Sequence, residues 1–461
     1  KRRMDRLRMG DPLDKAIDLG AVVDPVQLAT IRALVAEHGG EGEIYHADLE
    51  VPQGCFYPPT LVTGLAPSAR LMQEEIFGPV LVSATFRTPA EAIQLANDTR
   101  YGLAASVWSE NVNLALDVAA QLAAGVIWVN GTNMFDAAAP FGGVRESGFG
   151  REGGWEGLAA YTRPRADPPP APRIAPCPAP DSPGGTPPID RTAKMYVGGR
   201  QVRPDGGHSR AVWSPDGRLL GHVGEGNRKD IRNAVEAATA AASWGRTTGH
   251  ARAQILYFLA ENLAAREGEF AARIADMTGE DGAGEVAATI ARLFTWAAWA
   301  DKCDGAARGV PLRGLALALR QPTGVVGILA SPDAPLLGAA SATAAVIALG
   351  NRVVLVPSEP FPLAATDLYQ VLDTSDVPAG VVNIVTGAHD TLAPVLAAHL
   401  GVDAVWSFSD PALTPRIERA AAGNLKRTWC TAMDWRSSQA EGPAFRDAAT
   451  EIRTVWVPYG E

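Results

Sequence analysis

Short apolar runs separated by helical patterns dominate the C-terminal part of the chain. Four runs have the length of strands, and the first three are rich in β-branched residues, as in strands buried on both faces: Val325–Leu329, Val353–Val356, Val381–Val385 and Ala404–Ser407. Three Ala-rich stretches before them have the length of long helices: Lys229–Trp244, Ala251–Arg266 and Val286–Cys303. Strands that alternate with helices predict a doubly wound parallel sheet of the Rossmann type.

The N-terminal part of the chain alternates in the same way. We expect strands at Val80–Phe86, Ala104–Trp108 and Gly125–Val129, with helices at Pro89–Asn97 and Asn113–Leu122 between them. This order predicts parallel βαβ units. The whole chain is therefore expected to be of the α/β class, with a parallel sheet in each part.

A proline-rich segment separates the two parts. Residues 164–188 contain eleven prolines and a Gly-Gly pair. Such a composition cannot bury enough apolar surface to fold, and it is typical of a semi-rigid extended spacer. The segment divides the chain into a first segment, residues 1–163, and a second part, residues 189–461.

Composition narrows the possible partners. The chain has 461 residues and a formal net charge of −10, and no basic stretch offsets that charge, so we expect no nucleic-acid partner. The most apolar run, Ala334–Leu349, is shorter than the ~20 residues that span a bilayer. The chain also has no signal-peptide pattern. We therefore expect a soluble protein of the cytoplasm.

The four cysteines predict neither a disulfide framework nor a zinc site, because their spacing shows no pairs: Cys55, Cys177, Cys303 and Cys430. We assign no metal ligands.

Two strings in the first segment carry little information when each is taken alone. Glu75-Ile76-Phe77-Gly78-Pro79 contains a turn and a residue suited to a core, and the loop 140–152 contains four glycines. They occur in order with further strings: Met9–Asp14, Gln73–Val80, Asn97–Leu103 and Trp128–Asn130. Together these strings resemble the C-terminal half of the aldehyde dehydrogenase catalytic domain, over nearly all of residues 1–163.

The resemblance implies an NAD cofactor, with NADP left open, and an aldehyde substrate. Glu75 and Phe77 match the residues that hold the nicotinamide ribose and nicotinamide in that family. Phe135 and Phe141 lie in the stretch that matches the aldehyde entrance, where they either contact substrate or only pack.

The second part resembles the NAD-binding half of the same family, over roughly residues 193–428. The matching strings are Gly324–Ile328, Ala348–Val354, Pro357–Glu359, Pro378–Gly387 and Asn424–Arg427. Ala449–Tyr459 then resembles the family's C-terminal oligomerisation strand, and the catalytic domain that should intervene does not occur. We therefore expect a Rossmann-like domain at 189–445 and an oligomerisation tail at 446–461.

The departures in the second part fall on positions that carry chemistry. Asp333 stands where the family has the Asn of its oxyanion hole, Val356 replaces a Lys that contacts the adenosine ribose, and only Glu359 remains there. An anionic side chain would repel a developing oxyanion. The stretch 405–413 has no glycine for close approach of a pyrophosphate. Thr431 stands at the position of the general base.

No catalytic residue is assigned. The family's Gly-Gln-x-Cys string does not occur, and Cys430, which lies near the position of the lost base, is expected to pack.

This layout resembles aldehyde dehydrogenase family 16, in which an ordinary catalytic unit precedes a degenerate one. The resemblance implies that the upstream half of the catalytic unit precedes Lys1 and that the tail supplies the sheet edge in a homodimer. The expected function is thus part of an NAD-dependent aldehyde dehydrogenase. The alternative is a pseudoenzyme scaffold without catalysis, and retained nucleotide binding at Glu359 is a third possibility.

Overall fold

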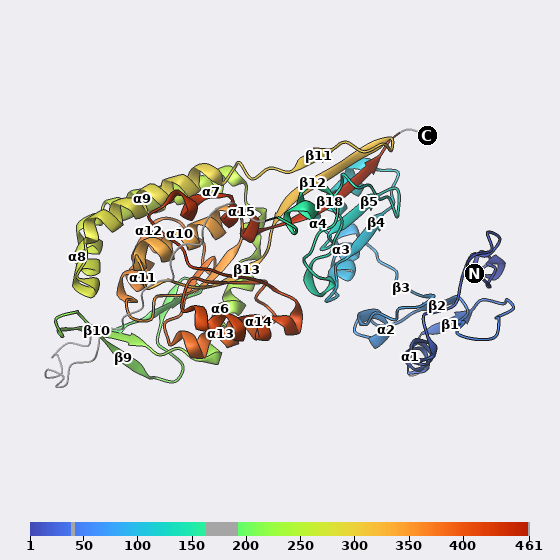
Figure 1. Ribbon diagram of the computed structural model, residues 1–461, viewed down its shortest axis with the longest axis horizontal. Coiled ribbons are helices and arrows are strands. Elements are labelled where there is room, and N and C mark those ends of the chain that lie inside the picture. Colours follow the sequence, from blue (N-terminus) through green and yellow to red (C-terminus); the bar gives the residue numbers. More distant parts are fainter. Residues whose placement is uncertain (38–41, 163–191, 460–461) are drawn as a thin grey trace.

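The computed structural model describes residues 1–37, 42–162 and 192–459. The expected linker at 164–188, with Cys177, lies outside these residues. The fold is α/β, as predicted, with the first segment and the second part side by side along the longest axis (Figure 1). Among the described residues, no helix is both long enough and apolar enough to cross a membrane.

The first segment begins with a small three-stranded sheet. Its strands are β1 (Glu43–His46), β2 (Thr60–Thr63) and β3 (Val80–Ser83), in the order β1-β2-β3. Helix α1 (Pro25–Ala36) begins where the Asp24 side chain accepts a hydrogen bond from the backbone of Gln27. The helix packs Ile31 and Leu34 into the core of this sheet.

Predicted helices and strands follow within a residue or a few of the expected bounds: α3 (Pro89–Asn97), β4 (Ala104–Val107), α4 (Val112–Gln121) and β5 (Val126–Val129). One prediction was wrong, because β3 and β4 do not form a βαβ unit within one sheet. β3 pairs with β2, whereas β4 pairs in parallel with β5 in a different sheet. Short helices α2 (Arg70–Gln73) and α5 (Gly154–Ala159) complete the segment.

The second part contains the predicted doubly wound sheet. Its seven strands run in the order β17-β16-β13-β14-β15-β7-β8: β17 (Arg427–Cys430), β16 (Ala404–Ser407), β13 (Val325–Leu329), β14 (Arg352–Val356), β15 (Val382–Ile384), β7 (Met195–Val197) and β8 (Arg200–Val202). The chain proceeds from β13 through β14 to β15 and then crosses to β16 on the other side of β13. We call residues 192–459, apart from the strands described below that leave this sheet, the Rossmann unit.

Helices cover both faces of this sheet (Figure 1). One face carries α7 (Gly249–Ala264), α8 (Glu267–Thr278), α9 (Gly282–Trp299), α10 (Pro335–Ala348), α11 (Leu363–Asp367), α12 (Tyr369–Thr374) and α15 (Pro443–Ala449). The other carries α6 (Arg228–Ala240), α13 (His389–Ala398) and α14 (Thr414–Ala421). The sequence did not predict α8, or the small sheet of β6 (Thr192–Ala193), β9 (Ser209–Trp213) and β10 (Leu219–Gly224).

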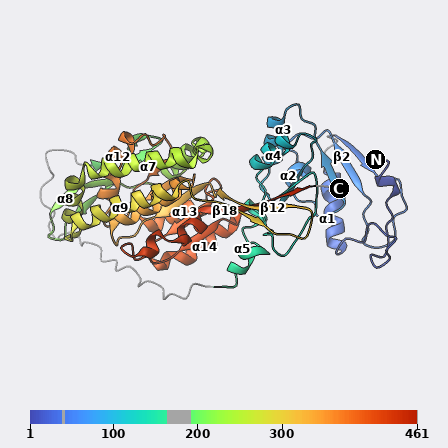
Figure 2. The same cartoon turned by 90° about the horizontal axis from the view of Figure 1, so that it is seen from above.

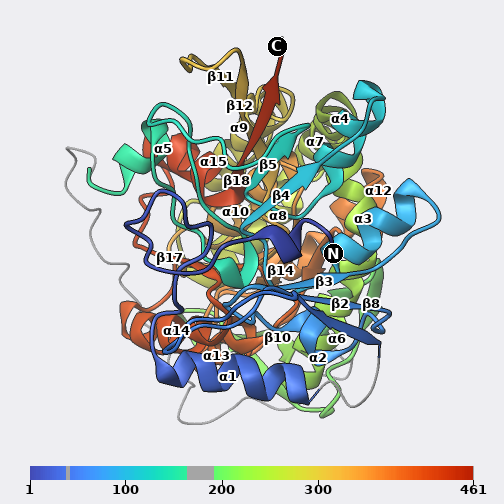
Figure 3. The same cartoon turned by 90° about the vertical axis from the view of Figure 1, so that its right-hand side faces the viewer.

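A five-stranded sheet joins the two parts of the chain. Its order is β11-β12-β18-β5-β4, with β11 (Ala306–Arg308), β12 (Gly314–Pro322) and β18 (Thr450–Pro458) contributed by the second part. β18, the predicted tail strand, pairs antiparallel with β12 on one side and parallel with β5 on the other. Figure 2 shows β12 and β18 extending from the Rossmann unit, and Figures 1 and 3 show them beside β5. Both hydrogen-bonding edges of the tail strand are therefore used within one chain.

Candidate functional site

The carboxyl ends of the parallel strands of the Rossmann unit border a cavity of about 380 Å³. Ligands of doubly wound sheets bind outside these strand ends, at the point where the strand order reverses. In this chain that point lies over β13, between β14 and β16. The lining includes Arg210, Trp213, Glu359, His389, Ser409 and Asp410. We call this cavity the crevice.

The acidic side chain expected at an adenosine ribose is already bonded within the chain. Oε2 of Glu359 accepts a hydrogen bond of 2.9 Å from the backbone N–H of His389. The backbone carbonyl of Glu359 accepts another from the Arg210 guanidinium, which belongs to β9. Glu359 therefore anchors α13 and β9 to the end of β14.

The turn after β13 holds an acid rather than an oxyanion donor. The backbone N–H of Asp333 donates to Ser331 Oγ at 3.0 Å, and Ala334 has φ of 49° just before α10 begins. Partial removal from water raises the pKa of the Asp333 carboxyl, and the neighbouring Glu280 charge raises it further, whereas Arg436 lowers it. An acid in such surroundings cannot supply the N–H donors that an oxyanion requires.

Neither Cys303 nor Cys430 is an activated nucleophile. Burial raises the pKa of the Cys303 thiol and that of the Cys430 thiol, so both stay protonated at neutral pH, where a nucleophile needs a thiolate. Cys430 ends β17, and Thr431 beside it donates its hydroxyl to the backbone oxygen of Ala432 at 3.1 Å. These surroundings agree with the expected packing role of Cys430.

Glu75 and Phe77 lie in the loop between α2 and β3. Phe77 has φ of 54° and is 67% exposed, and the side-chain amide of Gln27 donates to the carbonyls of Ile76 and Phe77 at 3.0 and 3.1 Å. Glu75 lines a cavity of about 530 Å³, and Tyr101 and Glu146 also line it. The loop thus fixes its backbone while it leaves both predicted side chains accessible.

Phe135 and Phe141 lie in a loop that packs against the five-stranded sheet, whereas Glu75 and Phe77 precede β3 of the small sheet. Their ring centroids are 4.9 Å apart, and the Phe135 ring lies 5.9 Å from that of Trp128, which is on β5. The indole N–H of Trp128 donates to the backbone of Met134, which holds the turn in place. The cluster packs against the five-stranded sheet. The structure therefore pairs the two phenylalanines with each other and does not bring them to the Glu75 loop.

Comparisons with known proteins decide the family. The model of the aldehyde dehydrogenase family matches residues 1–166 and 202–431, which is well over half of the chain. The chain belongs to the aldehyde dehydrogenase family.

Curated relatives in this family match about a third of their own length. The betaine aldehyde dehydrogenase of Cereibacter sphaeroides (strain ATCC 17029 / ATH 2.4.9) is 40% identical over 163 residues, which are 35% of this chain and 34% of the relative. The aldehyde dehydrogenase of Enchytraeus buchholzi is 43% identical over 165 residues, which are 34% and 32%.

Solved structures match about half of their length. An NAD-dependent aldehyde dehydrogenase from Sinorhizobium meliloti is 28% identical with a TM-score of 0.51, over 53% of this chain and 50% of that one. A 3,6-anhydro-L-galactose dehydrogenase in complex with NAP is 26% identical with a TM-score of 0.50, over 52% of each chain.

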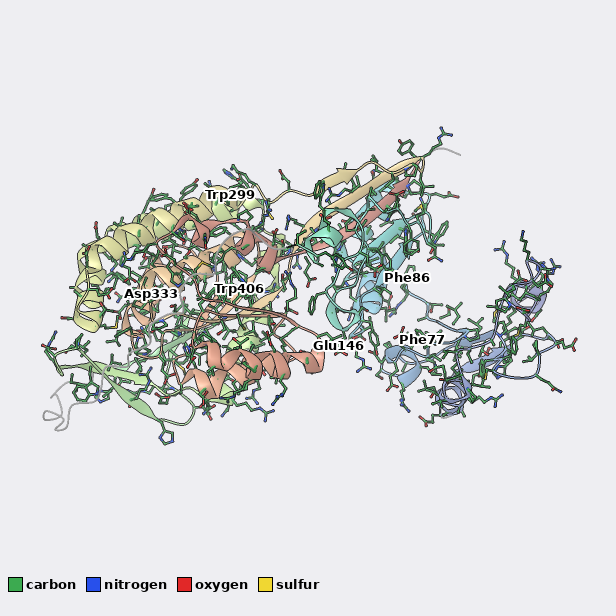
Figure 4. All side chains as sticks on the ribbon, viewed as in Figure 1. Phe77, Phe86, Glu146, Trp299, Asp333 and Trp406 are labelled. Carbon is green, nitrogen blue, oxygen red and sulfur yellow. The ribbon has the colours of Figure 1, made fainter. Side chains whose placement is uncertain are left out.

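Among the described residues, the two family-like parts do not combine into one catalytic centre. The first segment faces the amino ends of the Rossmann strands, across a groove of about 720 Å³. That groove is lined by residues that begin or precede strands, including Gly324, Arg352 and Lys426, and by Arg100 and Glu146 of the first segment. The crevice lies at the opposite, carboxyl ends. Figure 4 shows Glu146 and Phe77 on the side of the Rossmann unit away from Asp333.

Residues that join the two parts were not predicted from the sequence. Arg151, in the glycine loop, donates to the backbone oxygen of Ile452 on β18. The hydroxyl of Thr454 donates to the carbonyl of Pro140 at 2.6 Å. Arg308 on β11 forms an ion pair of 2.5 Å with Glu156 on α5. The glycines around Arg151 were the only signal in the sequence that this loop makes close contacts.

Proposed function

We propose that this chain is part of an NAD-dependent aldehyde dehydrogenase in which residues 189–445 form a non-catalytic domain and residues 446–461 join it to the catalytic part. The observation that carries the proposal is the insertion of β18 between β12 and β5. The β4–β5 pair of the first segment gains three further strands, β18, β12 and β11, from the second part. The second part therefore serves assembly.

Burial in the five-stranded sheet supports this assembly role. Val455 and Trp456 of β18 are 4% and 3% exposed. Val455 packs with Ile127 on one face of the sheet, and Trp456 packs with Trp128 on the other. Burial of such side chains contributes about 1.5–3 kcal/mol each, and β5 would otherwise expose its paired edge.

The nicotinamide roles of Glu75 and Phe77 require a cofactor held by another Rossmann unit, because the crevice of residues 189–445 lies at the far end of its sheet. Both side chains are accessible, as a ribose-binding carboxylate and a ring-contacting aromatic must be. When bound, NAD or NADP supplies the hydride acceptor for aldehyde oxidation. We propose a layout like that of family 16, in which the upstream half of the catalytic unit, with its cysteine and base, precedes Lys1.

A scaffold without catalysis is the second candidate. The protonated thiols of Cys303 and Cys430 and the acid at Asp333 favour it for this chain taken alone. In that case β18 would still hold the two parts together, and a homodimer through the tail would require two chains to exchange this strand.

The intact mass of the natural polypeptide, with an assay of aldehyde-dependent NADH formation, separates the two candidates. A mass well above the 48.4 kDa of this sequence, together with activity, supports the dehydrogenase. Glu75→Gln should then lower activity, whereas Glu74→Gln at the neighbouring position, which pairs with Arg70 at 2.9 Å, should leave it unchanged. A mass of 48.4 kDa without activity would establish the scaffold.

A further inference from the structure

The imidazole of His389 spans the crevice of the Rossmann unit. Nε2 lies 2.7 Å from the backbone oxygen of Pro357, and Nδ1 lies 2.7 Å from Ser409 Oγ. Pro357 follows β14 and Ser409 follows shortly after β16, and β13 lies between these two strands. His389 is 3% exposed. The ring therefore lies over the end of β13, where the strand order reverses and a dinucleotide would cross the sheet.

The two partners determine the protonation of the ring. The Pro357 carbonyl can only accept a hydrogen bond, so Nε2 carries the proton and donates it. In the neutral imidazole Nδ1 is then an acceptor, and the Ser409 hydroxyl donates to it. Burial lowers the pKa of His389, although the Pro357 carbonyl and the Glu359 charge oppose this effect. Both ring nitrogens are satisfied by groups of the chain itself.

Carboxylates of the chain also accept hydrogen bonds from backbone N–H groups at three helix starts near the carboxyl ends of the strands. Glu285, which is 2% exposed, accepts from the backbone N–H groups of Leu336 and Leu337 at 2.7 and 3.0 Å, at the start of α10. Glu359 accepts from the first N–H of α13, as described above. Asp410 accepts from Ala412 at 2.9 Å at the start of the 3-10 turn η4 (Pro411–Leu413), after β16.

Each of these three starts therefore has a carboxylate of the protein bonded to its backbone. A phosphate group at the start of α10 or α13 would meet this negative charge and would compete for N–H groups that are already bonded.

We infer that His389 and the carboxylates beside the crevice bind one another and the backbone groups that an adenine nucleotide would need, and that residues 192–459 keep the Rossmann fold without a cofactor. This does not depend on the proposed dehydrogenase activity, because the geometry lies wholly within the second part. It also implies that Glu359 holds the start of α13 and does not bind a nucleotide ribose. Residues 192–459 would then contribute β18 to the five-stranded sheet whether or not NAD is present.

Chemical rescue tests this inference. His389→Gly should leave a hole the size of an imidazole and lower the Tm of the full chain by about 5 °C. Millimolar imidazole should restore much of that loss. The matched control is His399→Gly, which removes a histidine just past the other end of α13 that is partly exposed; imidazole should not raise its Tm. Equal effects of imidazole on both variants would contradict this role of the His389 ring.

The unmodified chain gives a test that does not depend on the variants folding. ADP-ribose, which carries the adenosine and pyrophosphate but lacks the nicotinamide, should leave both its Tm and the imidazole ¹⁵N resonances of His389 unchanged. Those resonances should report a neutral ring protonated at Nε2 across pH 6 to 8, the range in which an ordinary histidine titrates (pKa about 6.5). A rise in Tm with ADP-ribose that Glu359→Gln abolishes would overturn the inference.

Discussion

The guanidinium of Arg151 donates two hydrogen bonds to the backbone oxygen of Ile452, from Nε at 3.2 Å and from Nη2 at 2.7 Å. Its Nη1 donates to the carbonyls of Gly143 and Gly150 at 2.6 and 2.8 Å. One side chain thus joins the glycine loop of the first segment to the tail strand of the second part. Since Arg151 meets carbonyls rather than carboxylates, the contact orders the backbone of both parts.

Arg151→Ala should therefore lower the free energy of unfolding by about 2–3 kcal/mol, because several carbonyls lose a charged donor. Urea denaturation followed by tryptophan fluorescence measures this. Arg87→Ala is the matched control in the same segment, since its side chain is 90% exposed, and its effect should stay within about 0.5 kcal/mol. Equal effects of the two substitutions would mean that Arg151 does not join the two parts.

The stability of the chain should depend on the oxygen acceptor of the Glu285 side chain more than on its negative charge. Burial raises the pKa of Glu285, although the two backbone N–H groups at the start of α10 favour its ionised form. Glu285→Ala leaves both buried donors without a partner and should cost about 3 kcal/mol. Glu285→Gln keeps an oxygen acceptor and should cost clearly less. A glutamine variant as unstable as the alanine variant would contradict this account of the helix start.

Lys426 should make the stability of the chain depend on pH in the alkaline range. Its ammonium donates to the carbonyl of Val402 at 2.8 Å and to that of His399, and burial lowers its pKa to about 8. A lysine whose pKa is lower in the folded state opposes folding below that pKa, and the penalty disappears as pH rises from about 8 towards the unfolded value near 10.4.

Relative to Lys426→Met, the unmodified chain should therefore gain about 2 kcal/mol between pH 8 and 10. Chemical denaturation of both proteins across this range measures the difference. Parallel pH profiles would show that the lysine keeps its ordinary pKa.

Phe141 should contribute to the stability of the first segment more than Phe135 does. Phe135 is 56% exposed, whereas Phe141 is partly buried against the five-stranded sheet. Phe141→Ala should cost about 2 kcal/mol and Phe135→Ala less than about 1 kcal/mol. Because the rings are in contact, a double-mutant cycle should show a coupling of about 0.5–1 kcal/mol. Additive effects would mean that the pair does not pack and would favour a role at the aldehyde entrance.

The hydrophobic pattern predicted much of the Rossmann unit because its strands are buried on both faces. The structure has β13 and β16 at the predicted bounds, and β14 and β15 differ only at their ends. The family match also agrees with the resemblance derived from the motifs. β12 was missed, although Leu315, Leu317 and Leu319 alternate with alanines as in a half-buried strand.

Contacts between distant parts of the chain could not be predicted in this way. The separation of β3 from β4 depends on which strands each edge meets, and the sequence does not record this. The bridging position of His389 depends on Pro357 and Ser409, which are 32 and 20 residues away in sequence. An isolated histidine near a helix start gives no such signal. The roles proposed for Glu75 and Phe77 remain predictions that rest on the resemblance.

A cysteine pair across β5 and β18 tests the central claim most directly, namely that the tail strand completes the sheet of the first segment within one chain. Ile127 and Val455 are register partners in the parallel pair. Ile127→Cys with Val455→Cys, in a background without the four natural cysteines, should form a disulfide under mild oxidation. We predict a crosslinked single chain of about 48 kDa on a non-reducing gel, with no crosslink when either cysteine is present alone. A disulfide-linked dimer would show that the tail is exchanged between two chains, and the absence of any crosslink would contradict the pairing itself.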